Sequence, residues 1–423
     1  MTRVLVVGGA GVFGSRLVES LVAAGIADIV VAGRNRARTA AAAGAVRARF
    51  AGARIDAARI DAAVLDGRTA TADDLRATGA AIVVDAAGPF QDAEPDLARA
   101  AIEAGIDYLD LADARDFVAR FPGLDGAARA AGTIAVTGMS STPALSHAVL
   151  DHMTSGWRRI DRVEAAISPG NRAPRGRSVI AAILSWAGKP VRVFVNGCWQ
   201  TRFGWSGTVS RRIASLGPRP LALAETADLD LLADRFRPRD AALFRAGLEL
   251  RALHGCLSLA AWLPRLRIVD SLAPLAGLFR HAAAVFERFG SDRGGMLVEA
   301  TGRDANDRPT VARWTLVAEA GDGPFVPTLP ALALIRRLAG DRRSLPPGAR
   351  SGAGLPPMAA IEAALGPAFE RLPEAVRASH RGGPVTRLAG EATIAGAATL
   401  PGRLVGRLFG FPPAGEGPCR CGW

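Results

Sequence analysis

Three glycines near the start of the chain have the spacing of a phosphate-binding turn. Gly9, Gly11 and Gly14 fit G-x-G-x-x-G between the apolar segment 3–7 and a stretch with apolar residues at helical spacing. In such a turn, the first glycine permits the tight turn, the second lets a pyrophosphate approach the backbone, and the third allows close helix–strand packing. The amides and dipole of the helix start attract the negative charge. We predict a dinucleotide site at Gly8, Gly9, Gly11, Val12, Phe13 and Gly14.

The end of the second predicted strand, 27–35, indicates which dinucleotide binds. NAD sites usually carry a carboxylate about 20 residues after the glycines, where it accepts from the ribose 2′-hydroxyl. Here the strand ends in Gly33, Arg34 and Asn35 without a carboxylate. The Arg34 guanidinium can bind a 2′-phosphate, although a solvated loop arginine is the alternative. We predict NADP, with NAD the less favoured cofactor, and assign Arg34 and Asn35 to its site.

Two further strand ends are expected to contact the cofactor. Asp66 ends the third predicted strand, 61–66, where its carboxylate could reach an adenine amine or cap the following turn. The loop after the fourth strand has little side-chain bulk, as a segment passing under a cofactor would, although an ordinary Gly-Pro turn is the competing interpretation. The residues of this loop that we assign to the site are Ala87, Gly88 and Pro89.

Residues that could orient a substrate follow the next two strands. Asp113 ends the fifth predicted strand, and Ser140 and Ser141 lie on the turn after the sixth. No general acid is identified, because Tyr108 and Lys189 are the only tyrosine and lysine and form no Tyr-x-x-x-Lys couple. We expect Tyr108 in the core. The motifs G-x-S-x-G and H-E-x-x-H are also absent, which excludes those hydrolase sites.

Strands and helices must alternate to bring these residues together. The expected strands are 3–7, 27–35, 61–66, 80–90 with its exit loop, 106–113 and the TIAVT segment. Helical patterns lie after the glycine turn, near Thr71, and at 95–105 and 115–132. This alternation predicts an α/β fold whose doubly wound parallel sheet is covered on both faces.

Composition restricts the partners. The formal net charge is +12, and the surplus lies after residue 140. No helix-turn-helix, finger or aromatic-basic signature accompanies it, so we predict no nucleic-acid partner but a pocket or surface that meets anions. The four cysteines form no C-x-x-C pair and predict no metal site. Together with the lack of a signal-peptide pattern, they favour a reducing cytoplasm.

The most apolar region, 257–279, is too interrupted to cross a bilayer. It contains Arg265, Arg267, Asp270 and two prolines. A buried helical core is the favoured interpretation, and a segment lying on a membrane surface or lining an apolar pocket is the alternative. We therefore predict no transmembrane segment.

The first third of the chain resembles the saccharopine dehydrogenase-like family of NADP-binding oxidoreductases. The carrying stretches, in order, are VVGGAGVFGSRLVESL, VAGRN, VVDAAGPFQ, YLDLAD and VTGMSSTPALS. Further on, SPGNRAPRGRSVIAAILSWAGKP, SDRGGMLVEATG and ARWTLVAEAGDGPFVP resemble the second domain of a less characterised bacterial branch. The resemblance implies a Rossmann domain at 1–140 and an α+β domain at 141–340 for substrate binding and dimer contact. It also implies a homodimer as a candidate assembly.

The end of the chain is expected to form a separate part. The Pro/Gly-rich segment 341–357 is predicted to be a linker. From about Phe369 the sequence resembles the start of an uncharacterised domain found behind such dehydrogenases, and it stops early. We therefore assign 358–423 to a truncated C-terminal domain.

The resemblance implies hydride transfer between NADPH and a C=O, C=N or conjugated C=C bond of a small-molecule substrate. Saccharopine itself would need clustered basic groups, which Arg172, Arg175 and Arg177 could supply, although a solvated basic loop is an equally good interpretation. The 257–279 region favours an apolar substrate. The alternative is a non-catalytic NAD(P)-binding protein for redox sensing or scaffolding, peripheral to a membrane.

Overall fold

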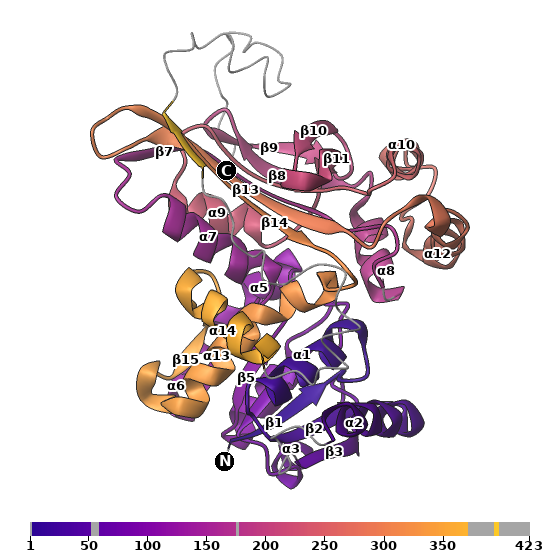
Figure 1. Ribbon diagram of the computed structural model, residues 1–423, viewed down its shortest axis with the longest axis vertical. Helices are drawn as coiled ribbons and strands as arrows, with labels where there is room; N and C mark the ends of the chain where they lie inside the picture. Colours follow the sequence, from indigo (N-terminus) through magenta and orange to yellow (C-terminus); the bar gives the residue numbers. More distant parts are fainter. Residues whose placement is uncertain (1, 52–58, 175–176, 371–392, 397–423) are drawn as a thin grey trace. The chain divides into compact units, whose positions relative to one another are not determined.

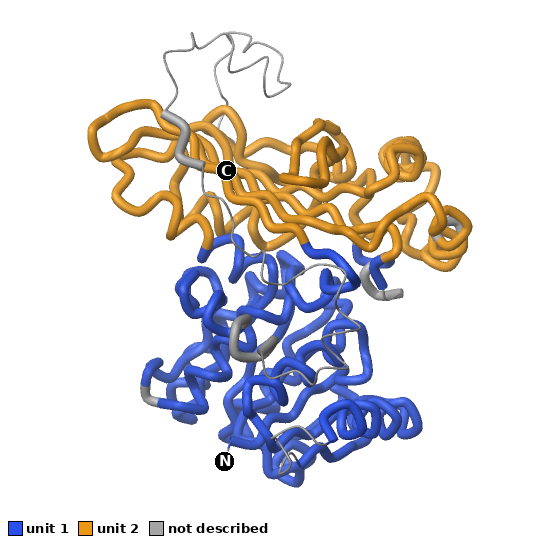
Figure 2. Tube along the Cα trace, in the orientation of Figure 1, with its two compact units in different colours: residues 1–148, 173–182, 318–388 blue, residues 149–172, 183–317, 389–423 orange. Residues whose placement is uncertain are grey.

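The computed structural model describes residues 2–51, 59–174, 177–370 and 393–396 (Figure 1). The chain forms two compact units, each made of segments that are distant in sequence (Figure 2). Unit 1 comprises 1–148, 173–182 and 318–388, and unit 2 comprises 149–172, 183–317 and 389–423.

Unit 1 is built on a seven-stranded sheet in which every strand is parallel to its neighbours. The strand order is β15-β6-β5-β4-β1-β2-β3. Its members are β1 (Arg3–Val7), β2 (Asp28–Gly33), β3 (Arg59–Val64), β4 (Ile82–Asp85), β5 (Asp107–Asp110), β6 (Ile134–Thr137) and β15 (Gly348–Ser351). The first six strands have the order of a Rossmann fold, whose ligands bind at the carboxyl ends where the order reverses, between β1 and β4. The predicted α/β class is confirmed.

Buried apolar residues explain why these segments are central strands. In β1, Val4, Leu5 and Val6 have no exposed surface, as expected for a parallel sheet covered on both faces. The connecting helices are α1 (Val12–Ala23), α2 (Arg36–Phe50), α3 (Ala72–Ala77), α4 (Asp96–Ala104), α5 (Arg115–Arg120) and α6 (Asp125–Ala130), with the short turn η1 (Phe121–Leu124) before α6. Tyr108 is fully buried against Phe121, which agrees with its expected place in the core.

The segment predicted to be a linker is part of unit 1, so that prediction is wrong. Strand β15 pairs with β6 from Gly348 to Ser351. Before it, Nε and Nη2 of Arg342 each donate to the buried Asp107 carboxylate at 2.7 Å. The turn η6 (Gly323–Thr328) and helix α13 (Leu329–Gly340) also belong to unit 1, so the predicted range 141–340 combines residues of both units. The turn η7 (Arg342–Ser344) precedes β15, and α14 (Met358–Glu370) follows it.

Unit 2 contains a nine-stranded mixed sheet. Its main path is β10-β11-β12-β7-β13-β14-β16, and β8 joins β9 to β12. The strands are β7 (Arg159–Ser168), β8 (Pro190–Val195), β9 (Cys198–Phe203), β10 (Val209–Arg212), β11 (Pro218–Leu223), β12 (Ala241–Ala246), β13 (Gly294–Arg303), β14 (Pro309–Ala318) and β16 (Thr393–Gly396). A core around Ala166, Ile213, Leu221 and Leu297 packs on this sheet. Both units thus confirm a Rossmann sheet plus a second α+β sheet.

Short helices complete unit 2. They are α9 (Asp228–Phe236), α10 (Arg251–Ala260), α11 (Trp262–Arg265) and α12 (Ala276–Val285), with the turns η3 (Ala214–Leu216), η4 (Ala273–Leu275) and η5 (Glu287–Phe289). Two helices span the boundary between the units: α7 (Ser146–Met153), after the turn η2 (Ser141–Leu145), and α8 (Arg177–Trp186). No helix among the described residues has the length and hydropathy needed to cross a bilayer.

The region 257–279 is not the buried core that its composition favoured. Leu266 is 62% exposed, Ile268 64% and Leu278 65%. This segment buries only part of its apolar surface, so the buried-core interpretation is wrong.

Candidate functional site

The glycine turn between β1 and α1 is tightly packed where the motif requires it. A Cβ atom on Gly14 would overlap the carbonyl oxygen of Gly8, so only glycine lets α1 approach the turn this closely. A Cβ on Gly9 would lie 2.9 Å from both the carbonyl oxygen of Val6 and Cγ1 of Val31. Gly8 itself has a φ of +77°, which favours glycine.

Gly11 has a different environment from the other glycines of the turn. It is the N-cap of α1, and a Cβ there would meet only the Gly8 carbonyl oxygen, at 3.0 Å. The first amides of α1, at Val12, Phe13 and Gly14, have no carbonyl partner within the helix, as at any helix start. No side chain caps them either. The bare backbone at Gly11 and these uncapped amides together form a cradle that fits a pyrophosphate.

The loop after β4 contacts this turn directly. A Cβ on Gly8 would lie 2.7 Å from the backbone of Ala86 and Ala87, so the two segments touch. The amide of Ala87 donates to the Asp85 carboxylate at 2.8 Å, which fixes the start of the loop. Gly88 and Pro89 follow in the same loop. The structure therefore brings the predicted residues of this loop together with the glycines.

The end of β2 presents Arg34 to solvent. Its side chain is exposed and has no hydrogen bond or ion pair with the described residues. Asn35 is occupied differently, because its side-chain oxygen caps α2 by accepting from the Arg38 amide at 3.0 Å. Arg34 is thus available to a ligand, whereas Asn35 positions the helix that follows it.

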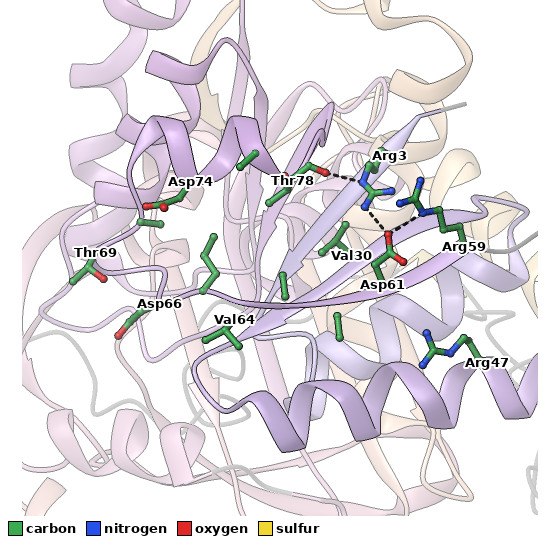
Figure 3. A pocket seen from close by; sticks show the side chains of 15 residues that line it. Arg3, Val30, Arg47, Arg59, Asp61, Val64, Asp66, Thr69, Asp74 and Thr78 are labelled. Carbon is green, nitrogen blue, oxygen red and sulfur yellow. Dashed lines mark hydrogen bonds and ion pairs between the residues drawn. The ribbon is translucent and has the colours of Figure 1, made fainter.

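Asp66 caps a turn at the end of β3. Its Oδ1 accepts from the Arg68 amide at 3.2 Å, and its carbonyl oxygen accepts from the amides of Thr69 and Ala70. The turn-capping interpretation is therefore the one observed, while contact with an adenine stays a prediction. Asp66 also lies at one end of a groove along β3, which reaches the ion pair of Arg3 with Asp61 at the other end (Figure 3).

The substrate-orienting candidates are held together through Asp110, the last residue of β5. Its Oδ1 accepts from the Ala112 amide at 2.9 Å, the Thr137 hydroxyl at 2.9 Å and the Gly138 amide at 2.7 Å. The first contact fixes the loop leading to Asp113, and the last fixes the loop leading to Ser140. One buried carboxyl thus holds both exit loops.

The candidates themselves have distinct environments. Asp113 is exposed and lies 3.5 Å from the side-chain amide of Gln91, which comes from the β4 loop. Ser140 is 8% and Ser141 7% exposed, and neither hydroxyl has a hydrogen-bond partner among the described residues. All three lie on exit loops at the carboxyl edge of the sheet.

A buried acidic cluster escaped the sequence analysis. Asp85 of β4 pairs in register with Asp110 of β5. Tyr108 lies two residues before Asp110 on β5. Burial raises the pKa of Asp110 to about 7 and that of Asp85 to about 6. Burial, with the charges of both carboxylates, also raises the pKa of Tyr108 well above its usual value. Among the described residues, Asp110 Oδ2 and the Tyr108 hydroxyl have no partner in hydrogen-bond geometry.

Of the three arginines considered for a carboxylate-rich substrate, Arg172 has a described side chain, and that side chain is occupied. The Arg172 guanidinium donates to the carbonyl oxygens of Glu287 and Arg288 at 3.1 and 3.3 Å. Arg175 lies outside the described residues, as does the side chain of Arg177. Arg172 therefore has a structural role, and a cluster of the three arginines stays untested.

Comparisons with known proteins agree with this geometry. The family model of the saccharopine dehydrogenase NADP binding domain matches residues 4–136. An apo saccharopine dehydrogenase (L-Glu forming) from Saccharomyces cerevisiae has a similar fold, with a TM-score of 0.61 and 14% identity over 94% of this chain and 100% of that chain. An amine dehydrogenase from Mycobacterium smegmatis reaches a TM-score of 0.41 at 14% identity, over 82% of this chain and 94% of that chain. No curated protein matches.

The family match and the strand order support the same conclusion. The matched range contains the glycine turn, Arg34, the β4 loop and the Asp110 cluster, and it ends within β6. The resemblance stated from the sequence is confirmed, and an NADP-binding domain supports an oxidoreductase. Residues 4–136 match the family model of the saccharopine dehydrogenase NADP binding domain, and the fold of the whole chain is similar to that of a saccharopine dehydrogenase.

Proposed function

We propose that the protein is an NADPH-dependent oxidoreductase that transfers hydride between NADPH and a C=O, C=N or conjugated C=C bond of a small molecule. The observation that carries the proposal is the glycine turn. Gly14 and Gly8 are packed so closely that only glycine fits, and no side chain caps the amides at the start of α1. Uncapped amides at a helix start, beside a glycine that leaves the backbone bare, are the arrangement that binds a pyrophosphate.

The residues present fit NADP. The amides at the start of α1 would hold the pyrophosphate, and Arg34 would hold the 2′-phosphate through charge-assisted hydrogen bonds. The loop of Ala87, Gly88 and Pro89, which contacts Gly8, would form the wall beneath the cofactor. When bound, the nicotinamide supplies or accepts the hydride, and the protein supplies orientation and electrostatics.

On the substrate side, Asp113, Ser140 and Ser141 are the orienting groups. The two serine hydroxyls, unused by the described residues, can donate to a carbonyl or imine substituent. Asp110 acts through the loops that it holds and does not itself contact the substrate. No residue is assigned as general acid. A cytoplasmic location and a homodimer stay predictions.

The test is a pair of fluorescence titrations with NADPH and NADH on the wild type and Arg34→Ala. We expect the wild type to bind NADPH more tightly and Arg34→Ala to lose about tenfold or more of that preference, since hydrogen bonds between charged groups contribute roughly 1.5–3 kcal/mol. Arg76→Ala is the control, because Arg76 is a surface arginine on α3, before the amino end of β4. If neither nucleotide binds, the proposal fails.

Turnover then separates an enzyme from a non-catalytic NADP-binding protein. NADPH oxidation with carbonyl, imine or conjugated alkene substrates supports the oxidoreductase. Tight NADPH binding without turnover over a broad panel of the three substrate classes supports the redox-sensing or scaffolding alternative.

A further inference from the structure

The exposed large hydrophobic side chains of this protein are concentrated in one segment. Of the twelve in the described part of the chain, ten lie between residues 259 and 289 of unit 2. We call their side chains the apolar patch. Leu259 is 72% exposed, Ile268 64%, Leu278 65% and Phe289 61%. Such a concentration marks an interaction surface, whereas scattered exposed hydrophobic residues are normal.

The segment that carries the patch is firmly anchored at its base. The Glu249 carboxylate accepts from the Ser291 amide at 2.8 Å and from the Ser291 hydroxyl at 2.6 Å. The residues just before and just after the patch segment are therefore bonded to each other. The side-chain amide of Asn171 donates to the Phe286 carbonyl oxygen at 3.1 Å. At the other side, Gly188 packs so closely on Ala261 that no side chain would fit there. The exposure of the patch is therefore part of a built structure.

The anchored segment lies at one end of unit 2. Helix α10 contacts β11, and the labels of α10 and α12 mark the end of the unit in Figure 1. The ring of His254 on α10 is buried against Trp205 and lies 3.1 Å from the Thr208 hydroxyl, which ties the helix to the loop between β9 and β10. The apolar side chains thus extend from a fixed platform.

The patch also carries positive charge. Residues 251–289 contain five arginines, all exposed, and only two acidic residues, Asp270 and Glu287. Arg265 lies 4.3 Å from the ring centroid of Trp262, so cationic and aromatic groups are interleaved on this surface. Exposed leucine, tryptophan and phenylalanine beside arginine are typical of helices that lie in a membrane interface.

We propose that residues 251–289 form a docking surface for an anionic membrane. The apolar side chains would enter the boundary between headgroups and acyl chains, and the arginines would contact the anionic headgroups. A second copy of the chain fits less well, because a two-fold interface places the same patch on both sides and would oppose ten arginines to four acids. The segment 397–423 of this chain is also a poorer occupant of the patch. It is itself basic, with three arginines and one glutamate, and so does not complement the charge of the patch arginines.

The experiment is co-sedimentation of the full-length protein with phosphatidylcholine vesicles, with and without roughly one third phosphatidylserine. Two paired variants separate the contributions: Leu266→Glu with Ile268→Glu, and Arg251→Ala with Arg280→Ala. All four side chains are exposed, so the variants are expected to fold. The matched controls are Val64→Glu, at a 53% exposed valine of unit 1, and Arg68→Ala.

We expect the wild type to bind the anionic vesicles and to bind pure phosphatidylcholine much more weakly. The arginine pair should weaken binding about fivefold for each residue removed, because each contributes about 1 kcal/mol near such a surface. The glutamate pair should weaken it on the order of tenfold or more, since apolar burial is lost and repulsion is added. Both controls should bind like the wild type.

Three results would overturn the proposal. One is the absence of binding to either vesicle. Another is equal loss of binding in the patch variants and the unit 1 controls. The third is concentration-dependent self-association that the glutamate pair abolishes while vesicle binding stays negligible, which would assign the patch to a second copy. None of these outcomes depends on NADPH binding.

Discussion

Asp85 and Asp110 occupy paired positions on the adjacent strands β4 and β5, at the carboxyl edge of the sheet where the cofactor is proposed to bind. Asp110 is fully buried and accepts three hydrogen bonds on one oxygen, while its other oxygen has none from the described residues. Two carboxyls this close favour the protonated form of one, because both charges would otherwise share a desolvated site.

This relationship predicts a pH-dependent stability. A pKa raised in the folded state means that the folded protein binds more protons than the unfolded chain between about pH 4 and the folded pKa, about 7 for Asp110. Its stabilising contribution is therefore complete below about pH 4 and is lost as the pH rises through about 7. Asp110→Asn, which cannot ionise, should lack this dependence.

The effect is measured as the difference in melting temperature between wild type and Asp110→Asn at about pH 5 and about pH 8. The wild type should lose roughly 2–3 kcal/mol relative to the variant over this range, because about two pH units lie between about pH 5 and the folded pKa, at about 1.4 kcal/mol each as the upper bound. Taking the difference cancels the carboxyls that do not interact with Asp110. A difference that does not change with pH contradicts the prediction.

The glycines of the turn should separate folding from binding. Gly14→Ala places a methyl group against the Gly8 carbonyl and should destabilise the protein by roughly 1–3 kcal/mol. Gly11→Ala meets a single atom at 3.0 Å and should keep a near-wild-type melting temperature while losing NADPH affinity. Calorimetry and NADPH titration of both variants check this pattern.

Gly44→Ala provides the control. Gly44 lies within α2, and a methyl group added there would have no atom of its surroundings within 4 Å. The substitution should raise stability by about 0.5–1 kcal/mol and leave NADPH binding unchanged. If Gly11→Ala bound NADPH like this control, the phosphate cradle would have to lie elsewhere.

Local patterns predict the Rossmann half well because its signals are short-range. The glycine turn, the buried strands and the helix start at Thr71 each depend on residues within one turn or strand, and Thr71 indeed forms a capping box with Asp74. The pairing of Gly348 with Ile134 is long-range, and a four-residue strand inside a Pro/Gly-rich segment carries no comparable pattern. For this reason the composition of 341–357 indicates a linker although the segment contains a strand.

The sequence predicts which loops form the candidate site, but it does not predict which side chains in them contact one another. Strand ends identify which residues reach the carboxyl edge, including Asp113 and Ser140. The pairing of Asp85 with Asp110 depends on strand register, which the sequence does not state. Exposure of Leu266 and Ile268 is likewise hidden, because an apolar run has the same pattern whether it packs inward or faces a partner.

The packing of the segment that leads into β15 should depend on Arg342. Its guanidinium forms two hydrogen bonds with Asp107, which is only 1% exposed, while Arg342 is half-exposed. Arg342→Ala leaves the buried carboxylate without its cation and should cost about 1–3 kcal/mol, less than a fully buried pair because solvent already screens the arginine. Digestion with thermolysin should then cut near Leu345 or Leu355 faster than in the wild type. A true linker would be cut equally fast in both proteins.

The last prediction concerns the contacts of Glu249 with Asn171 and Ser291, which anchor the base of the apolar patch and are called its stem here. Glu249 accepts from Asn171 and Ser291 and lies 3.3 Å from Arg219, whose side chain is 7% exposed. Desolvation acts to raise the pKa of Glu249, but these hydrogen bonds and the Arg219 charge together hold it below its ordinary value. A lowered folded pKa contributes stability above the unfolded value of about 4.3, and this contribution is lost as the pH falls through the folded pKa.

Glu249→Gln should therefore loosen the stem at neutral pH, because an amide nitrogen cannot accept from Ser291 or Arg219 and the buried guanidinium loses its carboxylate. Hydrogen exchange of the amides at 286–291 should accelerate by roughly tenfold or more, corresponding to about 1.4 kcal/mol or more of lost local stability. The amides of β1 should exchange as in the wild type, because they belong to unit 1. Equal acceleration in both places would mean that Glu249 supports the whole fold and not the stem alone.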